Sequence, residues 1–138
     1  MPVKTKVDGF ESGIVTRDGP RLVAFYREIM GFRELPPISI PGFCHIHRVA
    51  CGTTILRIVV PEQPPLNDHA GGEFMASTGY RYLLLVIENI SEVVDDVRSA
   101  GCGVPVPPTE IIPGTIVCQV QDPDGNHIEL VQVTKALV

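Results

Sequence analysis

A short segment near the end of the chain combines a sharp turn with two side chains that could do chemistry. It reads DPDGNHIELVQV and covers residues 122–133. Residues two apart on a strand share a face, so His127 and Glu129 should point to one side and Ile128 to the other. A carboxylate on a mostly apolar strand needs a partner or a pocket, which makes Glu129 the first candidate for a functional group.

A pair of histidines in the segment FCHIHRV is the second group of candidates. His45 and His47 are two residues apart on an expected strand and therefore share a face. Imidazole is the commonest transition-metal ligand, so this pair or His127 could form a metal site together with Glu129. The alternative that strand histidines are hydrated or hydrogen-bonded to the protein stays open.

Two segments have the pattern of an amphipathic helix. The first has Asp18 as its cap, Pro20 in its first turn and Gly31 as its stop. The second repeats this plan, with Ser91 as the cap and Gly101 as the stop. Apolar residues recur at helical spacing in both segments: Leu22, Phe25 or Tyr26, and Ile29 in the first, and Val93, Val94, Val97 and Ala100 in the second.

Strand-like runs surround each helix in the same order. One apolar or β-branched run precedes each helix and three follow it, and Gly, Pro or Asp bounds the runs. The order is therefore βαβββ, written twice. Corresponding residues of the two copies lie about 70 positions apart, as in the pairs Gly31 and Gly101, Glu11 and Tyr82, and Arg57 and Glu129.

A segment rich in Pro, Gly and polar residues, 61–79, separates the two copies and is interpreted as a linker or a lid. One βαβββ copy has too small a core to be stable alone. We therefore expect one α+β domain over residues 1–138, with module one at about 10–60 and module two at about 80–133. The modules are expected to form a curved, half-open mixed sheet around a cavity, with the helices on the outer face.

The composition excludes several classes of protein. Of the 138 residues, 44% are hydrophobic, which suffices for one packed core. The net charge is −5 and the eleven Lys and Arg are scattered, so we expect neither nucleic acid nor a membrane as a partner. No apolar run approaches the roughly 18 residues of a membrane span, and the segment MPVKTKVDGF lacks the apolar core of a signal peptide, which favours the cytoplasm. The four cysteines form no CxxC pair and are expected to be buried free thiols rather than disulfides or zinc ligands.

Two motifs, RLVAFYREIMGF at residues 21–32 and DPDGNHIEL at residues 122–130, occur at the separation that a double βαβββ order requires. Together they resemble the vicinal oxygen chelate superfamily, which includes glyoxalase I, extradiol dioxygenases and bleomycin resistance proteins. The resemblance covers about residues 10–133. It implies this fold, a small-molecule substrate or ligand, and a homodimer.

The resemblance also implies four pocket-facing positions, at which relatives typically hold a divalent metal. In this sequence the four positions fall on Glu11, Arg57, Tyr82 and Glu129. Arg57 is a permanent cation that cannot bind a metal and should instead pair with Glu11. The expected cofactor is therefore either none or a divalent metal ion held by Glu11 and Glu129.

Two functions from different classes fit these residues. The first is an enzyme that carries out isomerase- or lyase-like proton transfer on a small oxygenated metabolite. Glu129 or Glu11 would be the general base. Tyr82 would donate to the developing oxyanion, and Arg57 would bind a substrate oxygen.

The second function is that of a non-catalytic binding protein of the bleomycin-resistance type, which holds a drug or a metabolite. The low aromatic content of 6%, with no Trp, weakens the version of this idea that involves a planar drug. His127, His45 and His47 are further candidates for contact with the bound molecule. An enzyme would lose turnover when Glu129 is neutralised, whereas a binding protein has no turnover to lose.

Overall fold

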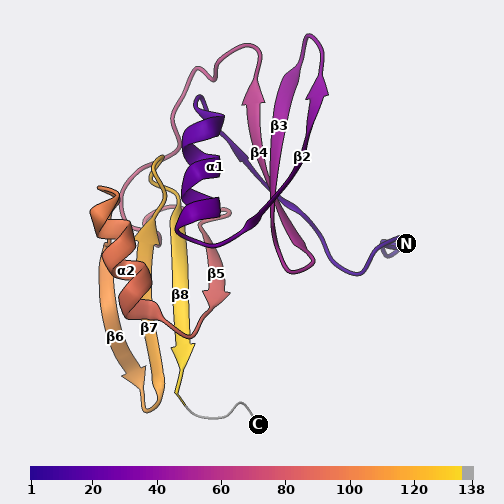
Figure 1. Ribbon diagram of the computed structural model, residues 1–138. Helices are drawn as coiled ribbons and strands as arrows, with labels where there is room; N and C mark the ends of the chain where they lie inside the picture. The colour runs from indigo at the N-terminus through magenta and orange to yellow at the C-terminus, as the bar shows by residue number, and fades with distance from the viewer. Residues whose placement is uncertain (135–138) are drawn as a thin grey trace. The chain divides into compact units, whose positions relative to one another are not determined.

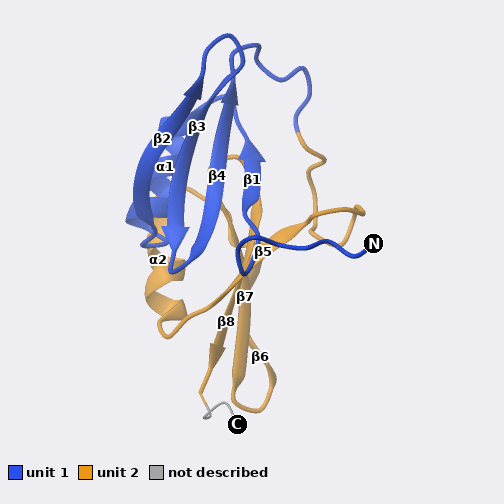
Figure 2. Cartoon of the chain, turned by 90° about the vertical axis from the view of Figure 1, so that its right-hand side faces the viewer, with its two compact units in different colours: residues 1–68 blue, residues 69–138 orange. Residues whose placement is uncertain are grey.

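The computed structural model describes residues 1–134 and contains two copies of one βαβββ plan (Figure 1). The chain divides into two compact units, with unit 1 spanning Met1–Asp68 and unit 2 beginning at His69 (Figure 2). Unit 1 holds β1 (Ser12–Val15), α1 (Gly19–Glu28), β2 (Arg33–Ile40), β3 (Cys44–Cys51) and β4 (Thr54–Pro61). Unit 2 holds β5 (Tyr82–Val86), α2 (Ile90–Ser99), β6 (Val106–Ile112), β7 (Thr115–Gln121) and β8 (His127–Val133). The predicted element order and the α+β class are confirmed.

Each unit contains one open, four-stranded mixed sheet. The strand orders are β1-β4-β3-β2 and β5-β8-β7-β6, so the first and last strands of each unit are neighbours. These neighbours run parallel, and the other pairs are antiparallel. Leu56 pairs with Ser12 in unit 1, as Ile128 pairs with Leu83 in unit 2. The repeat inferred from residue spacing is therefore a structural duplication, while one cavity shared by both modules stays a prediction.

Helix α1 begins and ends as its sequence predicts. The Asp18 carboxylate accepts a hydrogen bond from the Arg21 backbone N–H at 3.2 Å, and a proline occupies the first turn. Gly31, at φ +73°, allows the chain to leave the helix. The apolar side of α1 packs on β2, β3 and β4 through buried residues that include Leu22 and Tyr26.

Helix α2 begins earlier than expected, so the predicted cap at Ser91 is wrong. The N-cap is Asn89, which makes no side-chain capping bond. The exposed first N–H groups of a helix can take any acceptor, and the Ile90 N–H donates to Gln132 Oε1 of β8 at 2.9 Å. Gln132, which is distant in sequence, thus provides the acceptor that Ser91 was expected to provide. Gly101, at φ +75°, follows the helix as predicted.

The two edge strands β2 and β6 each contain a proline pair at a register shift. Pro36 and Pro37 lie in the irregularity of β2, and Pro107 and Pro108 lie in that of β6. Proline has no N–H for a ladder bond and is tolerated at the edge of a sheet. The segment CGVPVPP at residues 102–108 predicts the first strand after α2, whereas β6 runs from Val106 to Ile112.

The structure also bears on two expectations from composition. Neither helix in residues 1–134 is long and apolar enough to cross a membrane. All four cysteines are free, as predicted, but the expectation that they are buried holds only for Cys118 and is wrong for the exposed Cys51, which ends the β3 strand at the tight turn.

Candidate functional site

Each sheet has one face toward its own helix and one face turned away, which we call the open face. In unit 1 the buried Leu56 and Ile58 face α1, so Arg57 between them lies on the open face. Arg57 Nε donates to Glu11 Oε1 at 2.8 Å, which is the expected ion pair. The two side chains are 38% and 42% exposed, so water screens the pair and its contribution to stability is small.

A second arginine lies beside Arg57 and was not identified from the sequence. Arg48 of β3 is the direct antiparallel partner of Arg57. Its Nε donates to the Pro36 carbonyl oxygen at 3.0 Å. This pairing could have been predicted from the sequence. If a tight turn pairs Cys51 with Thr54, counting three residues outward along each strand pairs Arg48 with Arg57.

His45 and His47 share a face, as expected, but it is the face toward α1. The His47 ring lies so close to Gly19 of α1 that a Cβ there would be 2.5 Å from His47 Nε2. The two imidazole rings make an edge contact with centroids 4.6 Å apart. Burial and the neighbouring His45 lower the pKa of His47. The structure therefore does not bring these histidines to the Arg57 and Glu11 pair.

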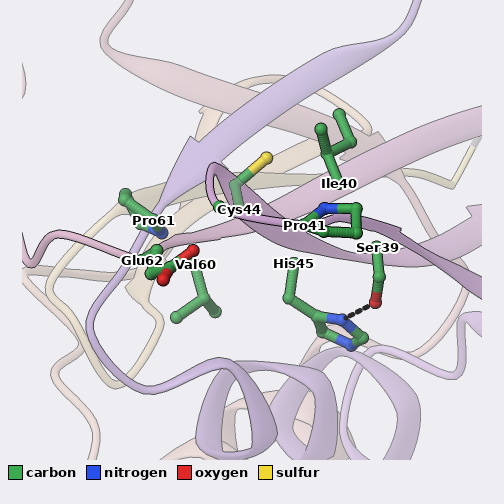
Figure 3. A pocket seen from close by; sticks show the side chains of 9 residues that line it. Ser39, Ile40, Pro41, Cys44, His45, Val60, Pro61 and Glu62 are labelled. Atoms are coloured by element: carbon green, nitrogen blue, oxygen red, sulfur yellow. Dashed lines mark hydrogen bonds between the residues drawn. The ribbon is translucent and has the colours of Figure 1, made fainter.

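His45 lines a shallow pocket of about 340 Å³ at one end of the unit 1 sheet. Figure 3 shows His45 and Ser39 on one side of the strands and Ile40 and Cys44 on the other. The Ser39 hydroxyl is 2.6 Å from His45 Nδ1, so part of the hydrogen-bonding capacity of the ring is used within the protein. Ligand binding by His45 stays a prediction.

In unit 2 the open face gathers three of the predicted residues. Ile128 and Leu130 are fully buried on the α2 side of β8, so His127 and Glu129 lie on the open face. Tyr82 of β5 is the register partner of His127. Tyr82, His127 and Glu129 are thus neighbours on two adjacent strands.

Gln119 of β7 joins this group and was also not identified from the sequence. It is the direct partner of Glu129 in the antiparallel pair of β7 and β8 and is only 2% exposed. Two buried polar atoms here, Gln119 Oε1 and His127 Nδ1, have no hydrogen-bond partner within residues 1–134. Because buried polar groups are normally hydrogen-bonded, two unsatisfied atoms beside Glu129 indicate a place prepared for a ligand or water.

The segment before β5 packs against this face. The His127 Nε2–H donates to the Gly72 carbonyl oxygen at 3.1 Å, which fixes the tautomer and leaves Nδ1 as an acceptor. The Phe74 ring makes an edge contact with Tyr82, with centroids 5.5 Å apart. Arg81 Nε donates to the Phe74 carbonyl oxygen at 2.8 Å and holds the segment in place.

The turn that precedes β8 is organised by one buried carboxylate. Asp122 is 2% exposed, and its Oδ1 accepts from the backbone N–H groups of Asp124 and Asn126 at 2.9 and 3.0 Å. Gly125 supplies the positive φ of +85° that the turn requires. The motif DPDGN therefore sets where β8 begins, and with it the positions of His127 and Glu129.

A model of the Glyoxalase/Bleomycin resistance protein/Dioxygenase superfamily matches residues 8–130. The chain belongs to this superfamily. No curated protein sequence matches it significantly. Among solved structures, a glyoxalase-superfamily protein from Bacillus cereus is 15% identical with a TM-score of 0.86, covering 98% of this chain and 99% of that chain.

Two glyoxalase I structures are also similar. The trypanothione-dependent enzyme from Leishmania major is 21% identical with a TM-score of 0.71, over 88% of this chain and 84% of that chain. A glyoxalase I mutant from Zea mays is 18% identical with a TM-score of 0.75, over 91% of this chain and 44% of that chain. Identities this low show the shared glyoxalase fold alone.

Members of the glyoxalase superfamily often bind a divalent metal, but the donor set of this chain does not suit one. Arg57, at one of the four positions that the resemblance predicts for metal ligands, has N–H donors and no lone pair to offer. Glu11, at another, already accepts a hydrogen bond from Arg57. Across residues 1–134 no three His, Cys, Asp or Glu side chains are grouped as metal ligands would be.

Proposed function

We propose that this glyoxalase-superfamily chain is an enzyme that transfers a proton on a small oxygenated metabolite, in an isomerase- or lyase-like reaction that needs no metal. The observation that carries the proposal is the setting of Glu129. Its carboxylate is half-buried on the open face of unit 2, beside two buried polar atoms without partners. Within the described residues Glu129 has neither an ion-pair nor a hydrogen-bond partner, so its oxygens are free to accept a proton.

Glu129 is the proposed general base. It takes a proton from a carbon beside a carbonyl, and the electron pair of the broken C–H bond moves to the carbonyl oxygen as an enolate. In an isomerase the substrate is an α-hydroxy carbonyl compound: its hydroxyl proton passes to the enolate oxygen, Glu129 returns its proton to the former carbonyl carbon, and the hydroxyl-bearing carbon becomes the new carbonyl. In a lyase the enolate re-forms the carbonyl as the bond to the leaving group breaks, and the leaving group takes the proton from Glu129. Glu11, the other candidate, is a poorer base because it is engaged by Arg57.

Tyr82 is proposed to act on an oxygen atom of the substrate. The Tyr82 side chain is half exposed on the same face as Glu129, and Phe74 fixes its ring. Its hydroxyl is therefore available to donate to the enolate oxygen. Arg57 lies in unit 1, and binding of a ligand oxygen by the terminal nitrogens that Glu11 leaves free stays a prediction from the sequence.

Proton exchange with solvent tests the proposal without knowledge of the natural substrate. Small hydroxyketones and oxo acids are incubated with the protein in deuterated water and excess chelator, and loss of the C–H signal is followed by NMR. Glu129→Gln should slow exchange at least about a hundredfold, the usual range for losing a general base. Tyr82→Phe should slow it less, and Glu88→Gln, an exposed carboxylate in the same unit, should leave it unchanged.

Full activity in Glu129→Gln, or exchange that vanishes when chelator is added, would overturn this proposal. A folded variant is verified by its circular dichroism spectrum. The products distinguish the two versions of the reaction. An isomerase gives one product with deuterium on the neighbouring carbon, whereas a lyase releases a second product.

A non-catalytic binding protein is the second candidate, and one observation favours it. Tyr82, Leu84 and Val86 form a row on β5 and are 50%, 45% and 63% exposed. Such a row offers apolar contact to a ligand. This candidate predicts ligand binding without exchange in any compound of the panel, and binding that survives Glu129→Gln.

A further inference from the structure

Two arginines face each other on the open face of unit 1. Arg48 and Arg57 are direct partners in the antiparallel pair of β3 and β4, and such partners point to the same side of the sheet. Arg33 of β2 pairs with Ala50, two residues from Arg48, and therefore extends the same face. Like charges directly opposite one another destabilise a sheet unless an anion compensates them. Glu11 is the acid that pairs with this cluster, and it bonds to Arg57 alone.

Each guanidinium of the pair is held at one nitrogen and free at the others. Arg57 Nε is taken by Glu11, and Arg48 Nε by the neutral carbonyl of Pro36, so Arg48 keeps an uncompensated charge. No residue in the described part of the chain accepts from the terminal nitrogens of either side chain. Both side chains are partly exposed, so a ligand in solution can reach their terminal nitrogens and accept charge-assisted hydrogen bonds from them.

We propose that Arg48 and Arg57 together bind the oxyanion group of a small molecule, a carboxylate or a phosphate. The planar fork of a guanidinium matches the oxygen geometry of both groups. Anchoring at Nε by β2 for Arg48 and by Glu11 for Arg57 orients the free ends in advance, so little side-chain entropy is lost on binding. The inference goes beyond the proposed function, because the anion site is formed by residues of unit 1 alone.

Calorimetric titration of the whole chain tests the site directly. Inorganic phosphate and succinate are titrated separately at constant ionic strength, with succinamide as the uncharged counterpart of succinate. We expect saturable binding of at least one anion with one site per chain, and no binding of succinamide. The anion that binds more tightly tells a phosphate ester from a carboxylate as the natural group.

Variants locate the binding site. Arg48→Gln and Arg57→Gln should each weaken binding about tenfold or more, since each removes a charged hydrogen bond. Arg48→Lys keeps the charge and loses the fork, so it should weaken binding as well, and it covers the case in which Arg48→Gln fails to fold. Arg27→Gln makes the same change of charge on α1, where Arg27 pairs with Glu28 and Glu34, and should change the affinity less than twofold.

If all the variants, including Arg27→Gln, weaken anion binding equally, the anions are attracted non-specifically by positive charge. If no anion binds saturably, Arg48 and Arg57 are ordinary hydrated surface arginines. Either result overturns the site. The proposed reaction is judged separately: loss of exchange in Glu129→Gln with normal anion binding supports the base whatever becomes of the arginines. Arginine-dependent binding with unaltered exchange in Glu129→Gln would retain the anion site and reject the base.

Discussion

Gly19 is the residue at which helix α1 comes closest to the sheet of unit 1. A Cβ placed there would lie 2.5 Å from His47 Nε2 and 2.8 Å from Val60 Cγ2, both shorter than contacts that real side chains make. The absence of a side chain at position 19 therefore lets the first turn of α1 rest on His47.

Gly19→Ala should destabilise the protein by about 1–3 kcal/mol, because both neighbouring side chains must move to admit a methyl group. Urea unfolding followed by circular dichroism measures the change. Gly13→Ala is the matched control, since a Cβ at Gly13 meets nothing within 4 Å. Equal stability of the two variants would show that His47 and Val60 yield without cost.

Residue types and strand alternation revealed part of the candidate site. They placed His127 beside Glu129 and paired Arg57 with Glu11, because both relations follow from residues two apart or from opposite charge. Gln119 was missed because its importance lies in burial without a partner, which no residue pattern displays. The face taken by His45 could not be foreseen either, since alternation tells which residues share a side but not which side the helix covers.

At the scale of elements, the segment that leads into β5 is fastened to the turn before β8. His69 Nε2 is 2.7 Å from the Asp124 carbonyl oxygen, and its Nδ1 is 3.2 Å from the carbonyl oxygen of Ala70. Carbonyls only accept, so both bonds form fully when the imidazole carries two protons. The hydrogen bond to Asp124, followed by that to Ala70, raises the pKa of His69 above 6.5.

A raised pKa in the folded state means that His69 stabilises the protein fully below pH 6.5, and that this contribution is lost as the pH rises through the folded value. The advantage of the native protein over His69→Gln in urea unfolding should therefore be largest below pH 6.5 and shrink as the pH rises above it. Comparison with the variant isolates His69 from His47, whose pKa shifts the opposite way. A difference that is constant with pH would contradict the assignment.

The elements themselves were largely predictable, since glycine, proline and helical spacing are local signals. Asp18 and Gly31 bound α1 where the pattern indicated. The failure at the start of α2 occurred where a distant residue decides, because Gln132 of β8 accepts the hydrogen bond from the Ile90 N–H. Such contacts depend on the tertiary fold and cannot be predicted from the neighbouring residues.

At the scale of the whole molecule, we predict a homodimer. In unit 2 the edge strand β5 exposes Leu84 and Val86, and β6 exposes Ile111 and Ile112. Exposed apolar residues on edge strands invite pairing with another chain. Light scattering during size exclusion should give twice the mass of one chain, and Val86→Glu should reduce it to that of a monomer. Val7→Glu, which alters an exposed residue outside the sheets, should not.

The duplicated plan was visible in the order of elements even though the two copies share few residues. What sequence could not supply at this scale is the identity of the substrate. Membership of the glyoxalase superfamily fixes the backbone plan, whereas the substrate depends on the particular side chains of the site.

The adjacency of first and last strands also constrains how the protein is made. On the ribosome, β1 emerges early but has no neighbour until β4 has been synthesised, because Ser12 must meet Leu56. The meander of β2, β3 and β4 requires only local pairing and can form first, with the long loop closed afterwards. Each half of the nascent chain thus carries an unmatched leading strand, a natural point for chaperone attachment until its closing strand arrives.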